Sequence, residues 1–329
     1  MISYIIRRIL IMIPTLFAVS MISFAIIQLP PGDFLTTYAS QLRSQGDVVD
    51  EAEIAALRER YGLGMPIHQQ YARWISGIVL RGDWGQSMEW RKPVRDLIGE
   101  RILLTIILSL AALAVSWFIA IPLGVYCATR QYSIPDYLIT LASFIGVGTP
   151  GFLLALLIMW VAQSSFGLNV GGLFSEAFMD APWSMAKAWD LAKHIWIPVL
   201  ILALNGTAGG LRTTRANLLD EMNKPYVETA RSKGLTESQL TWKYPVRLAL
   251  SPFVSTLGWE LANLVSGATL ISVVLSLQTT GPLMLRALLS QDMYLAGSFL
   301  LVLSTLTVIG TLFSDILLAW IDPRIRMQQ

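Results

Sequence analysis

Long apolar runs constrain this chain more than any other feature of its sequence. Six stretches reach the length of about 20 residues that a helix needs to cross a bilayer. They lie at roughly 8–29, 102–129, 136–163, 195–215, 250–276 and 295–320. Only 14% of the residues are charged, and the mean hydropathy is +0.57. We therefore predict an all-α polytopic membrane protein with six transmembrane helices.

Composition also excludes several kinds of site. The chain has one cysteine, Cys127, and two histidines, His68 and His194, which cannot form a disulfide framework or a four-ligand zinc site within the chain. A formal net charge of +2 is too small to suggest nucleic-acid binding. The phosphate-binding pattern G-x-x-x-x-G-K-[ST] does not occur. We expect no catalytic residues, no metal and no cofactor bound by this chain itself.

The distribution of lysine and arginine indicates the orientation. If the N-terminus is cytoplasmic, most basic residues between the spans fall on the cytoplasmic side. The two shorter external loops then hold only Lys187, Lys193 and Arg286. Both termini are predicted to be cytoplasmic, and the loop at about 216–249 becomes the largest cytoplasmic segment.

The chain divides into a first transmembrane helix (1–30), an external segment (31–101) and a five-helix core (102–329). In the external segment, AEIAALRERYGL has helical periodicity that ends at glycine, HQQYARWISGIVL is a second amphipathic stretch, and GDWGQSMEWRKPV is turn-rich. We predict a small ordered external subdomain. It is either a membrane-surface cap or, as Trp74, Trp84 and Trp90 favour, a docking surface for an extracytoplasmic partner.

The large cytoplasmic loop carries unusually clear local signals. The run YVETARSK is compatible with a helix, and Gly234 stands where a left-handed residue would end it. Thr236 and Gln239 then form a T-x-x-Q capping box for the next helix. We predict two short helices with a fixed bend between them.

The same loop combines charges of both signs with apolar side chains at Val227, Ala230, Leu235, Leu240 and Trp242. Such a surface suits packing into a groove on another soluble protein. The alternative is a cytoplasmic hairpin that packs only on itself.

Two motifs inside the spans favour helix packing over ligand binding. GVGTPG at 146–151 fits the dinucleotide pattern but lacks a preceding strand, so we expect close helix approach and a kink at Pro150. Asn205, Gly206 and Thr207 match a glycosylation acceptor but lie within a span. We interpret them as part of a small-residue interface.

The fifth span has a polar face. Thr256, Glu260, Asn263 and Gly267 are separated by four, three and four positions, so they share one side of a helix. An acidic side chain within lipid costs roughly 2.5–3.5 kcal/mol, which favours a position facing the bundle interior or an aqueous path. This face either lines a translocation pathway or makes structural hydrogen bonds between helices. GPLMLRALLSQDM, which follows, is predicted to be a short external helix.

A family resemblance covers nearly the whole chain. Glu228, Ala230 and Gly234 match the E-x-A-x-x-x-G core of the EAA loop of ABC importer permeases, with Thr229 in place of the first alanine. KYPVRLALSP is similar to the H-x-x-R-N-A-L-x-P run of the dipeptide and oligopeptide permeases, although Tyr244 and Leu248 replace the histidine and the asparagine. RRILIMIPTLFAVSMISFAIIQLPPGD, YGLGMPIHQQYARWISGIVLRGDWGQSM and RANLLDEMNKPYVETARSKGL resemble the first permease subunit of that subfamily.

The resemblance implies a type I ABC importer fold in a bacterial inner (plasma) membrane. The loop would be the coupling element that seats in the ATPase subunit, with Glu228, Ala230, Arg231, Gly234 and Leu235 as coupling residues. Implied partners are a homologous second permease, two ATP-binding cassette ATPases that bind ATP and Mg, and an extracytoplasmic solute-binding protein. This chain would be a transport subunit and not an enzyme.

The resemblance implies ATP-driven, binding-protein-dependent import of di- or oligopeptides by alternating access, with Thr256, Glu260 and Asn263 along the pathway. The same importer type carrying oligosaccharides is the alternative. A remote alternative is an ion-coupled secondary transporter that uses intramembrane carboxylates such as Glu260.

Overall fold

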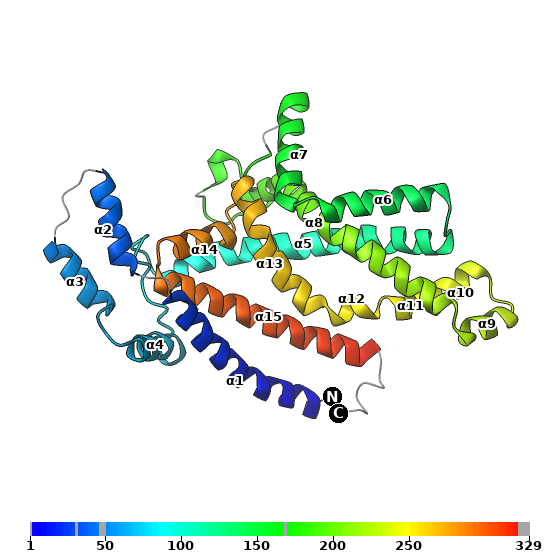
Figure 1. The fold of residues 1–329 in the computed structure, drawn as a ribbon. Coiled ribbons are helices and arrows are strands. Elements are labelled where there is room, and N and C mark those ends of the chain that lie inside the picture. The colour runs from blue at the N-terminus through cyan, green and yellow to red at the C-terminus, as the bar shows by residue number, and fades with distance from the viewer. Residues whose placement is uncertain (1, 30–31, 46–50, 168–169, 180, 322–329) are drawn as a thin grey trace. The chain divides into compact units, whose positions relative to one another are not determined.

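The computed structural model describes residues 2–29, 32–45, 51–167, 170–179 and 181–321. Throughout these ranges the chain is helical or irregular, and its β structure is limited to one isolated bridge between Gln86 and Pro93. The all-α prediction is confirmed (Figure 1). The helices are α1 (Ile2–Ile27), α2 (Phe34–Gln45), α3 (Glu51–Tyr61), α4 (Ile67–Ser76), the π-helical turn η1 (Gly77–Arg81), α5 (Val94–Thr129), α6 (Ile134–Gly148), α7 (Gly151–Phe166), the 3-10 turn η2 (Glu176–Phe178), α8 (Met185–Met222), α9 (Pro225–Ser232), α10 (Glu237–Lys243), α11 (Pro245–Ala249), α12 (Ser251–Ser255), α13 (Leu257–Val274), α14 (Thr280–Leu289) and α15 (Met293–Ile321).

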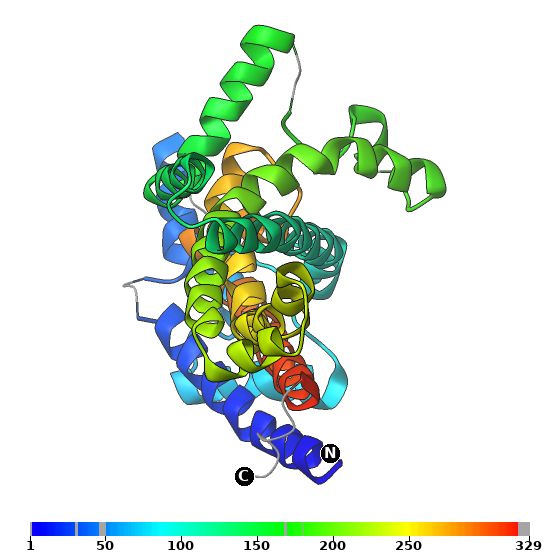
Figure 2. The same ribbon diagram turned by 90° about the vertical axis from the view of Figure 1, so that its right-hand side faces the viewer.

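Among the described residues, four helices are long and apolar enough to cross a membrane, namely Ile6–Ile27 of α1, α5, α8 and Met293–Leu318 of α15. The predicted span at 136–163 is not one continuous helix. It breaks into α6 and α7, which are bent by 105° (Figure 1 and Figure 2). The cause is Pro150, which lacks an N–H and forces Thr149 into an extended conformation (φ −98°, ψ 124°).

The predicted count of six spans is not confirmed, because the bent pair adds one span at most. The predicted span at 250–276 corresponds to α12 and α13, and many side chains of α13 lie outside the described residues.

The chain forms two compact units by its internal contacts: Met1–Leu104 with Thr279–Val308, and Thr105–Gln278 with Ile309–Gln329. In the first unit, α3 ends at Gly62 (φ +68°) as predicted, and α14 is the short helix predicted after the fifth span. The segment from Gly82 to Pro93 is irregular, as its turn-rich sequence predicts. A buried cluster that includes Phe24, Trp74 and Phe299 holds these elements together.

The second unit is organised around α8, against which α6, α7 and α11 pack. Small residues allow the close approach. A Cβ added to Gly124 of α5 would lie 2.5 Å from Cβ of Thr214, and one added to Gly206 would lie 2.7 Å from Oγ of Ser116. A Cβ on Gly151 would lie 2.5 Å from Nδ2 of Asn205. The small-residue packing predicted for both motifs is therefore confirmed.

Candidate functional site

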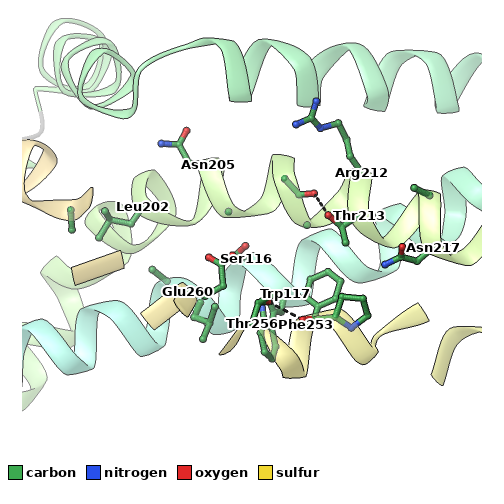
Figure 3. Close-up of a pocket in the computed structure, with 18 of the residues that line it drawn as sticks. Ser116, Trp117, Leu202, Asn205, Arg212, Thr213, Asn217, Phe253, Thr256 and Glu260 are labelled. Carbon is green, nitrogen blue, oxygen red and sulfur yellow. Dashed lines mark hydrogen bonds between the residues drawn. The ribbon is translucent and has the colours of Figure 1, made fainter. Parts of the chain in front are cut away.

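A cavity of 840 Å³ lies within the second unit, between α5, α8, α12 and α13 (Figure 3). Its wall is mixed in character. The polar and charged residues that line it are Ser116, Asn205, Arg212, Thr213, Asn217, Thr256 and Glu260, and its aromatic residues are Trp117 and Phe253. The rings of Trp117 and Phe253 pack edge to face, with centroids 5.6 Å apart, and they join α5 to α12. A cavity of this size and polarity accommodates a small polar solute.

Two threonine hydroxyls in this wall are paired with backbone carbonyls. Thr213 donates from Oγ1 to the carbonyl of Gly209 at 3.1 Å, and Thr256 donates to the carbonyl of Pro252 at 2.9 Å (Figure 3). Both bonds run back four residues, within α8 for Thr213 and at the end of α12 for Thr256, which is the usual way a threonine hydroxyl pairs with the helix backbone.

The structure brings together two of the three predicted pathway residues. Thr256 and Glu260 line the cavity from the junction of α12 with α13. The side chain of Asn263 lies outside the described residues, so its predicted position beside them stays a prediction. Glu260 is the only acidic residue among those that line the cavity, and it is half-buried.

Sequence reasoning missed the contribution of α8 to this wall. Asn205, Gly209, Arg212 and Ala216 all line the cavity, and their spacings of four, three and four place them on one face of the helix. That periodicity is visible in the sequence. A packing interface at Asn205 is compatible with a cavity wall, so this periodicity by itself does not show that the face lines a cavity.

Arg212, the basic residue of the wall, lies beside an aromatic ring. The guanidinium of Arg212 lies 5.3 Å from the ring centroid of Phe144 on α6. Its Nε is buried and has no hydrogen-bond partner among the described residues. The cavity is thus lined by one acidic and one basic side chain. In the part of the chain that the structure describes, no group of three His, Cys, Asp or Glu side chains could hold a metal ion.

A helical hairpin follows α8 directly, and it consists of α9 and α10 (Figure 1). Gly234 between them has φ +83°, the left-handed conformation predicted from its place after α9. The Oγ1 of Thr236 accepts a hydrogen bond from the backbone N–H of Gln239 at 3.4 Å, which is the predicted cap of the second helix. The predicted pair of short helices with a fixed bend is confirmed.

One expectation about this hairpin is wrong. Val227, Ala230 and Leu240 are buried, and they form a small core inside the hairpin rather than a surface for a partner. Tyr226 and Leu235 are partly buried against that core, and of the five predicted apolar surface residues only Trp242 is exposed. The physical reason is that the bend at Gly234 folds the apolar sides of both helices onto each other, which removes them from water.

The predicted coupling residues therefore fall into two groups. Glu228, Arg231 and Gly234 are exposed, whereas Ala230 is buried and Leu235 is half-buried in the hairpin core. Across the bend, Arg231 donates from Nε and Nη2 to the two carboxylate oxygens of Glu237, at 2.6 and 3.1 Å. These hydrogen bonds lower the pKa of Glu237 and raise the pKa of Arg231. The bidentate pair joins α9 to the first turn of α10 across the bend.

The junction between α8 and the hairpin is also constrained. The hydroxyl of Tyr226 donates to Glu221 Oε2 at 2.7 Å, and Lys224 Nζ lies 2.5 Å from Glu221 Oε1. Burial, and then the bond to Glu221, raises the pKa of Tyr226 well above its usual range, so the phenol keeps its proton. On the return path, Val246 and Ala249 of α11 are buried against Leu218 of α8. The hairpin is attached to α8 on both sides.

Residues 120–327 match the family described as binding-protein-dependent transport system inner membrane component, and residues 1–111 match the N-terminal model of such membrane components. The chain is 33% identical over 326 residues to the oligopeptide transport system permease protein AppB of Bacillus subtilis, with 99% of each chain covered. It is 30% identical over 326 residues to the glutathione transport system permease protein GsiC of Escherichia coli K12, again with 99% of each covered. It is 29% identical over 341 residues to the dipeptide transport system permease protein DppB of Alkalihalophilus pseudofirmus, with 99% of this chain and 100% of DppB covered.

Proposed function

We infer that this chain, which belongs to the family of binding-protein-dependent transport system inner membrane components, is one permease subunit of an ATP-driven importer of short peptides. The observation that carries this inference is the dual role of α8. Residues of α8 from Leu202 to Asn217 line the cavity, and the same unbroken helix ends at Met222, just before the hairpin.

Met222 lies five positions after Asn217, which is about 8 Å of helix. A rigid helix of this kind transmits a displacement of the hairpin to the cavity wall, whereas a flexible linker would absorb it. The exposed surface around Glu228, Arg231 and Gly234 would meet the ATPase, and the buried Ala230 and Leu235 would keep that surface rigid. ATP binding by two partner ATPases would close the hairpins together and turn the cavity outward, and hydrolysis would reset it.

The cargo we propose is a di- or oligopeptide. Relatives that match over 99% of this chain are named as oligopeptide, dipeptide and glutathione permeases. The cavity wall has one acidic and one basic side chain, Glu260 and Arg212, which suit the charged ends of a peptide better than a neutral oligosaccharide.

We further propose that both termini and the hairpin lie on the cytoplasmic side, as the positions of lysine and arginine indicate. The other components would be a homologous second permease, two ATPases that bind ATP and Mg, and a solute-binding protein on the outer side. The chain itself would then carry out no chemistry.

The test is reconstitution of the chain with its permease, ATPase and binding-protein partner subunits. Peptide-loaded binding protein should stimulate ATP hydrolysis and uptake of labelled peptide into vesicles, and a proton uncoupler should leave uptake unchanged. Oligosaccharide-loaded binding protein serves as the comparison. Stimulation by oligosaccharide alone would contradict the cargo, and uptake that the uncoupler abolishes would contradict the importer class.

A further inference from the structure

We propose that the segment formed by α4 and η1 lies in the membrane interface beside α1, with one apolar edge among the lipid acyl chains. This inference concerns the external segment and is independent of the cargo proposed above. Lipid would cover an apolar surface of α4 and η1 that the described residues leave exposed.

The contacts between α4 and α1 extend far down the apolar part of α1. Gln28 donates from Nε2 to Gln70 Oε1 at 3.1 Å, near the C-terminal end of α1. Further down, the ring of Trp74 stacks on Phe24 at 5.6 Å between centroids. Tyr71 reaches lowest, because its hydroxyl lies 2.8 Å from Ser20 Oγ and its ring lies 6.2 Å from that of Phe17.

These contacts show how deep α4 lies relative to the apolar stretch of α1. The apolar stretch of α1 ends at Ile27, so Ser20 lies about 10 Å and Phe17 about 15 Å below that end at a rise of about 1.5 Å per residue. Half of the hydrocarbon layer is itself about 15 Å thick. These contacts lie further below that end than a tyrosine side chain extends, so they place α4 at the level of the interface rather than in the water above the membrane.

An apolar row lies on the corresponding side of α4. Ile67, Tyr71 and Ile75 follow one another at intervals of four, so they form a row beside α1, in which Ile67 is exposed and Tyr71 and Ile75 are half-buried. The row continues into η1, where Val79 and Leu80 are 70% and 78% exposed. Exposed apolar side chains of α1 next to this contact, including Phe17 and Met21, adjoin the same surface. The apolar edge of α4 and η1 is thus continuous with a helix that faces lipid.

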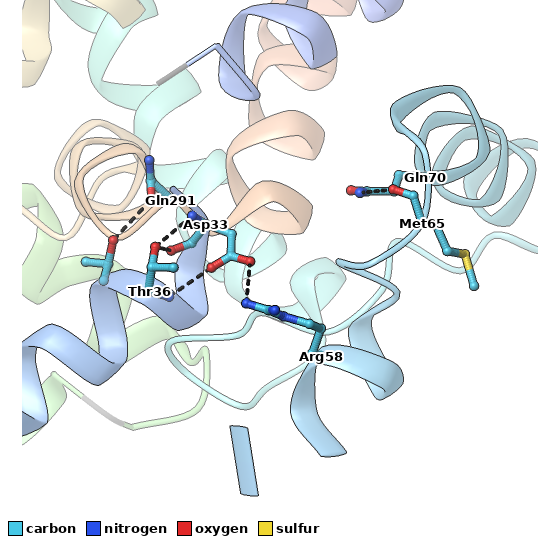
Figure 4. Close-up of polar contacts among 7 residues, drawn as sticks. Asp33, Thr36, Arg58, Met65, Gln70 and Gln291 are labelled. Atoms are coloured by element: carbon cyan, nitrogen blue, oxygen red, sulfur yellow. Dashed lines mark hydrogen bonds and ion pairs between the residues drawn. The ribbon is translucent and has the colours of Figure 1, made fainter. Parts of the chain in front are cut away.

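The opposite edge of α4 is polar. Gln69 and Arg73 are exposed there, and Arg81 is exposed at the end of η1. The start of α4 is fixed by Gln70, which donates from Nε2 to the carbonyl of Met65 at 2.8 Å (Figure 4). A helix with one apolar edge, one polar edge and flanking arginines has the composition of an interfacial helix.

The same unit holds the rest of the external segment in place around this helix. Asp33 accepts a hydrogen bond from the N–H of Thr36 at 2.8 Å and pairs with Arg58 at 3.4 Å, while Thr37 donates to Gln291 at 3.1 Å (Figure 4). These contacts join α2 and α3 to the turn after α14. A helix anchored in lipid would therefore fix the whole external segment relative to the membrane surface.

The test measures the depth of single side chains. The one cysteine, Cys127, is replaced by alanine, and a cysteine introduced by Val79→Cys, Leu80→Cys or Gln69→Cys is labelled with a nitroxide in the assembled transporter. The transporter is reconstituted into vesicles of phosphatidylethanolamine and phosphatidylglycerol. Collision rates are measured with oxygen, which concentrates in the acyl chains, and with a water-soluble nickel chelate.

We expect the ratio of oxygen to nickel collisions at positions 79 and 80 to exceed that at position 69 several-fold. Equal nickel access at all three positions would show that the edge faces water and would overturn the proposal. Loss of access to both reagents at 79 and 80 would also overturn it, because a protein subunit would then cover the edge. Failure of peptide-stimulated ATP hydrolysis in the same vesicles would contradict the proposed function without affecting this result.

Discussion

Arg215 of α8 donates two parallel hydrogen bonds, each 2.9 Å long, to the two carboxylate oxygens of Asp136 at the start of α6. Asp136 is almost completely buried, and one of its oxygens also accepts from the backbone N–H of Tyr132 at 3.0 Å. The pair joins α6 to the part of α8 that leads into the hairpin. It is therefore placed to make α6 and α8 move as one body.

Removing one partner of this pair should be costly, because the other charge would stay buried and unpaired. We expect Asp136→Asn or Arg215→Gln to lower the free energy of unfolding by about 3 kcal/mol. Arg58→Gln, which breaks the more exposed pair with Asp33, should cost less than about 1 kcal/mol. Thermal unfolding of the purified transporter checks both values. Equal costs for the two sites would contradict the buried role of Asp136.

The left-handed turn at Gly234 predicts a specific order among its variants. The space around its Cβ position is open, so a substitution is opposed only by the backbone conformation. Asn tolerates this conformation and Val does not, at a cost of about 1–2 kcal/mol. We expect Gly234→Val to lose binding-protein-stimulated ATP hydrolysis and Gly234→Asn to retain most of it. Gly99→Val, at a helical position that is also open, is the matched control. If Asn is as damaging as Val, the partner surface excludes any side chain there.

The pair of Arg231 and Glu237 should matter for coupling more than for stability, because both side chains are exposed. We expect Arg231→Glu to reduce stimulated ATP hydrolysis and the added change Glu237→Arg to restore it, since the reversed pair can hold the same bend. The low pKa of Glu237 keeps the pair ionised at neutral pH, and it is lost only when the pH falls through that pKa, below the usual glutamate value of about 4.3. A doubly reversed variant no better than Arg231→Glu would mean that Arg231 contacts the ATPase directly.

A variant of Glu260 tests whether the cavity contacts the cargo. Glu260→Gln keeps the size of the side chain and removes its charge. If the carboxylate meets the amino terminus of a peptide, the variant should transport a peptide with a free amino group about tenfold more slowly, which corresponds to about 1.4 kcal/mol. Uptake of the N-acetylated peptide should be unchanged. The comparison is made per ATP hydrolysed, so a defect in coupling would slow both peptides alike.

We expect the buried carboxylate of Asp292 to make the stability of the first unit depend on pH. This carboxylate accepts hydrogen bonds from Ser87 Oγ at 2.5 Å, from the backbone N–H groups of Met88 and Glu89, and from that of Leu295, where it caps α15. Burial outweighs these bonds and raises its pKa. The folded state then holds the proton more tightly than the unfolded state, so this residue makes stability fall as the pH rises from the unfolded value of about 3.9 through the raised pKa.

Asp292→Asn should remove this pH-dependent change while keeping the cap of α15, because Asn and Asp are about equally good N-cap residues. Thermal unfolding measured across acidic pH checks this expectation. An unchanged pH profile in Asp292→Asn would show that another group titrates. Ser87→Ala is a milder comparison, because it removes one donor and leaves the ionisable group in place.

The hairpin shows which structural features local sequence can predict. Gly234 and Thr236 specify the bend and the cap through their own conformational preferences, so both could be predicted without knowing what the hairpin packs against. The burial of Ala230 and Leu240 could not, because the same residues are compatible with an exposed apolar surface until the two helices fold together.

The cavity shows the same limit at longer range. Thr256 and Glu260 were predicted to share a face, since helical spacing alone determines that. The face of α8 that completes the wall, with Asn205 and Arg212, depends on which helix lies opposite, and no local pattern specifies that pairing. The sequence predicts a kink at Pro150, but the proline alone does not specify its angle of 105°.

By itself, the sequence determined the helical class, the membrane environment, the two-helix hairpin and the family resemblance, because these depend on hydropathy, short-range backbone preferences and contiguous motifs. The tertiary structure alone decided that Asp136 pairs with Arg215, that Ser87 binds Asp292, and that α4 lies against the apolar part of α1. Each of these contacts joins residues far apart in the chain. Their partners are selected by the fit of whole helices, which buries complementary surfaces that no single segment defines.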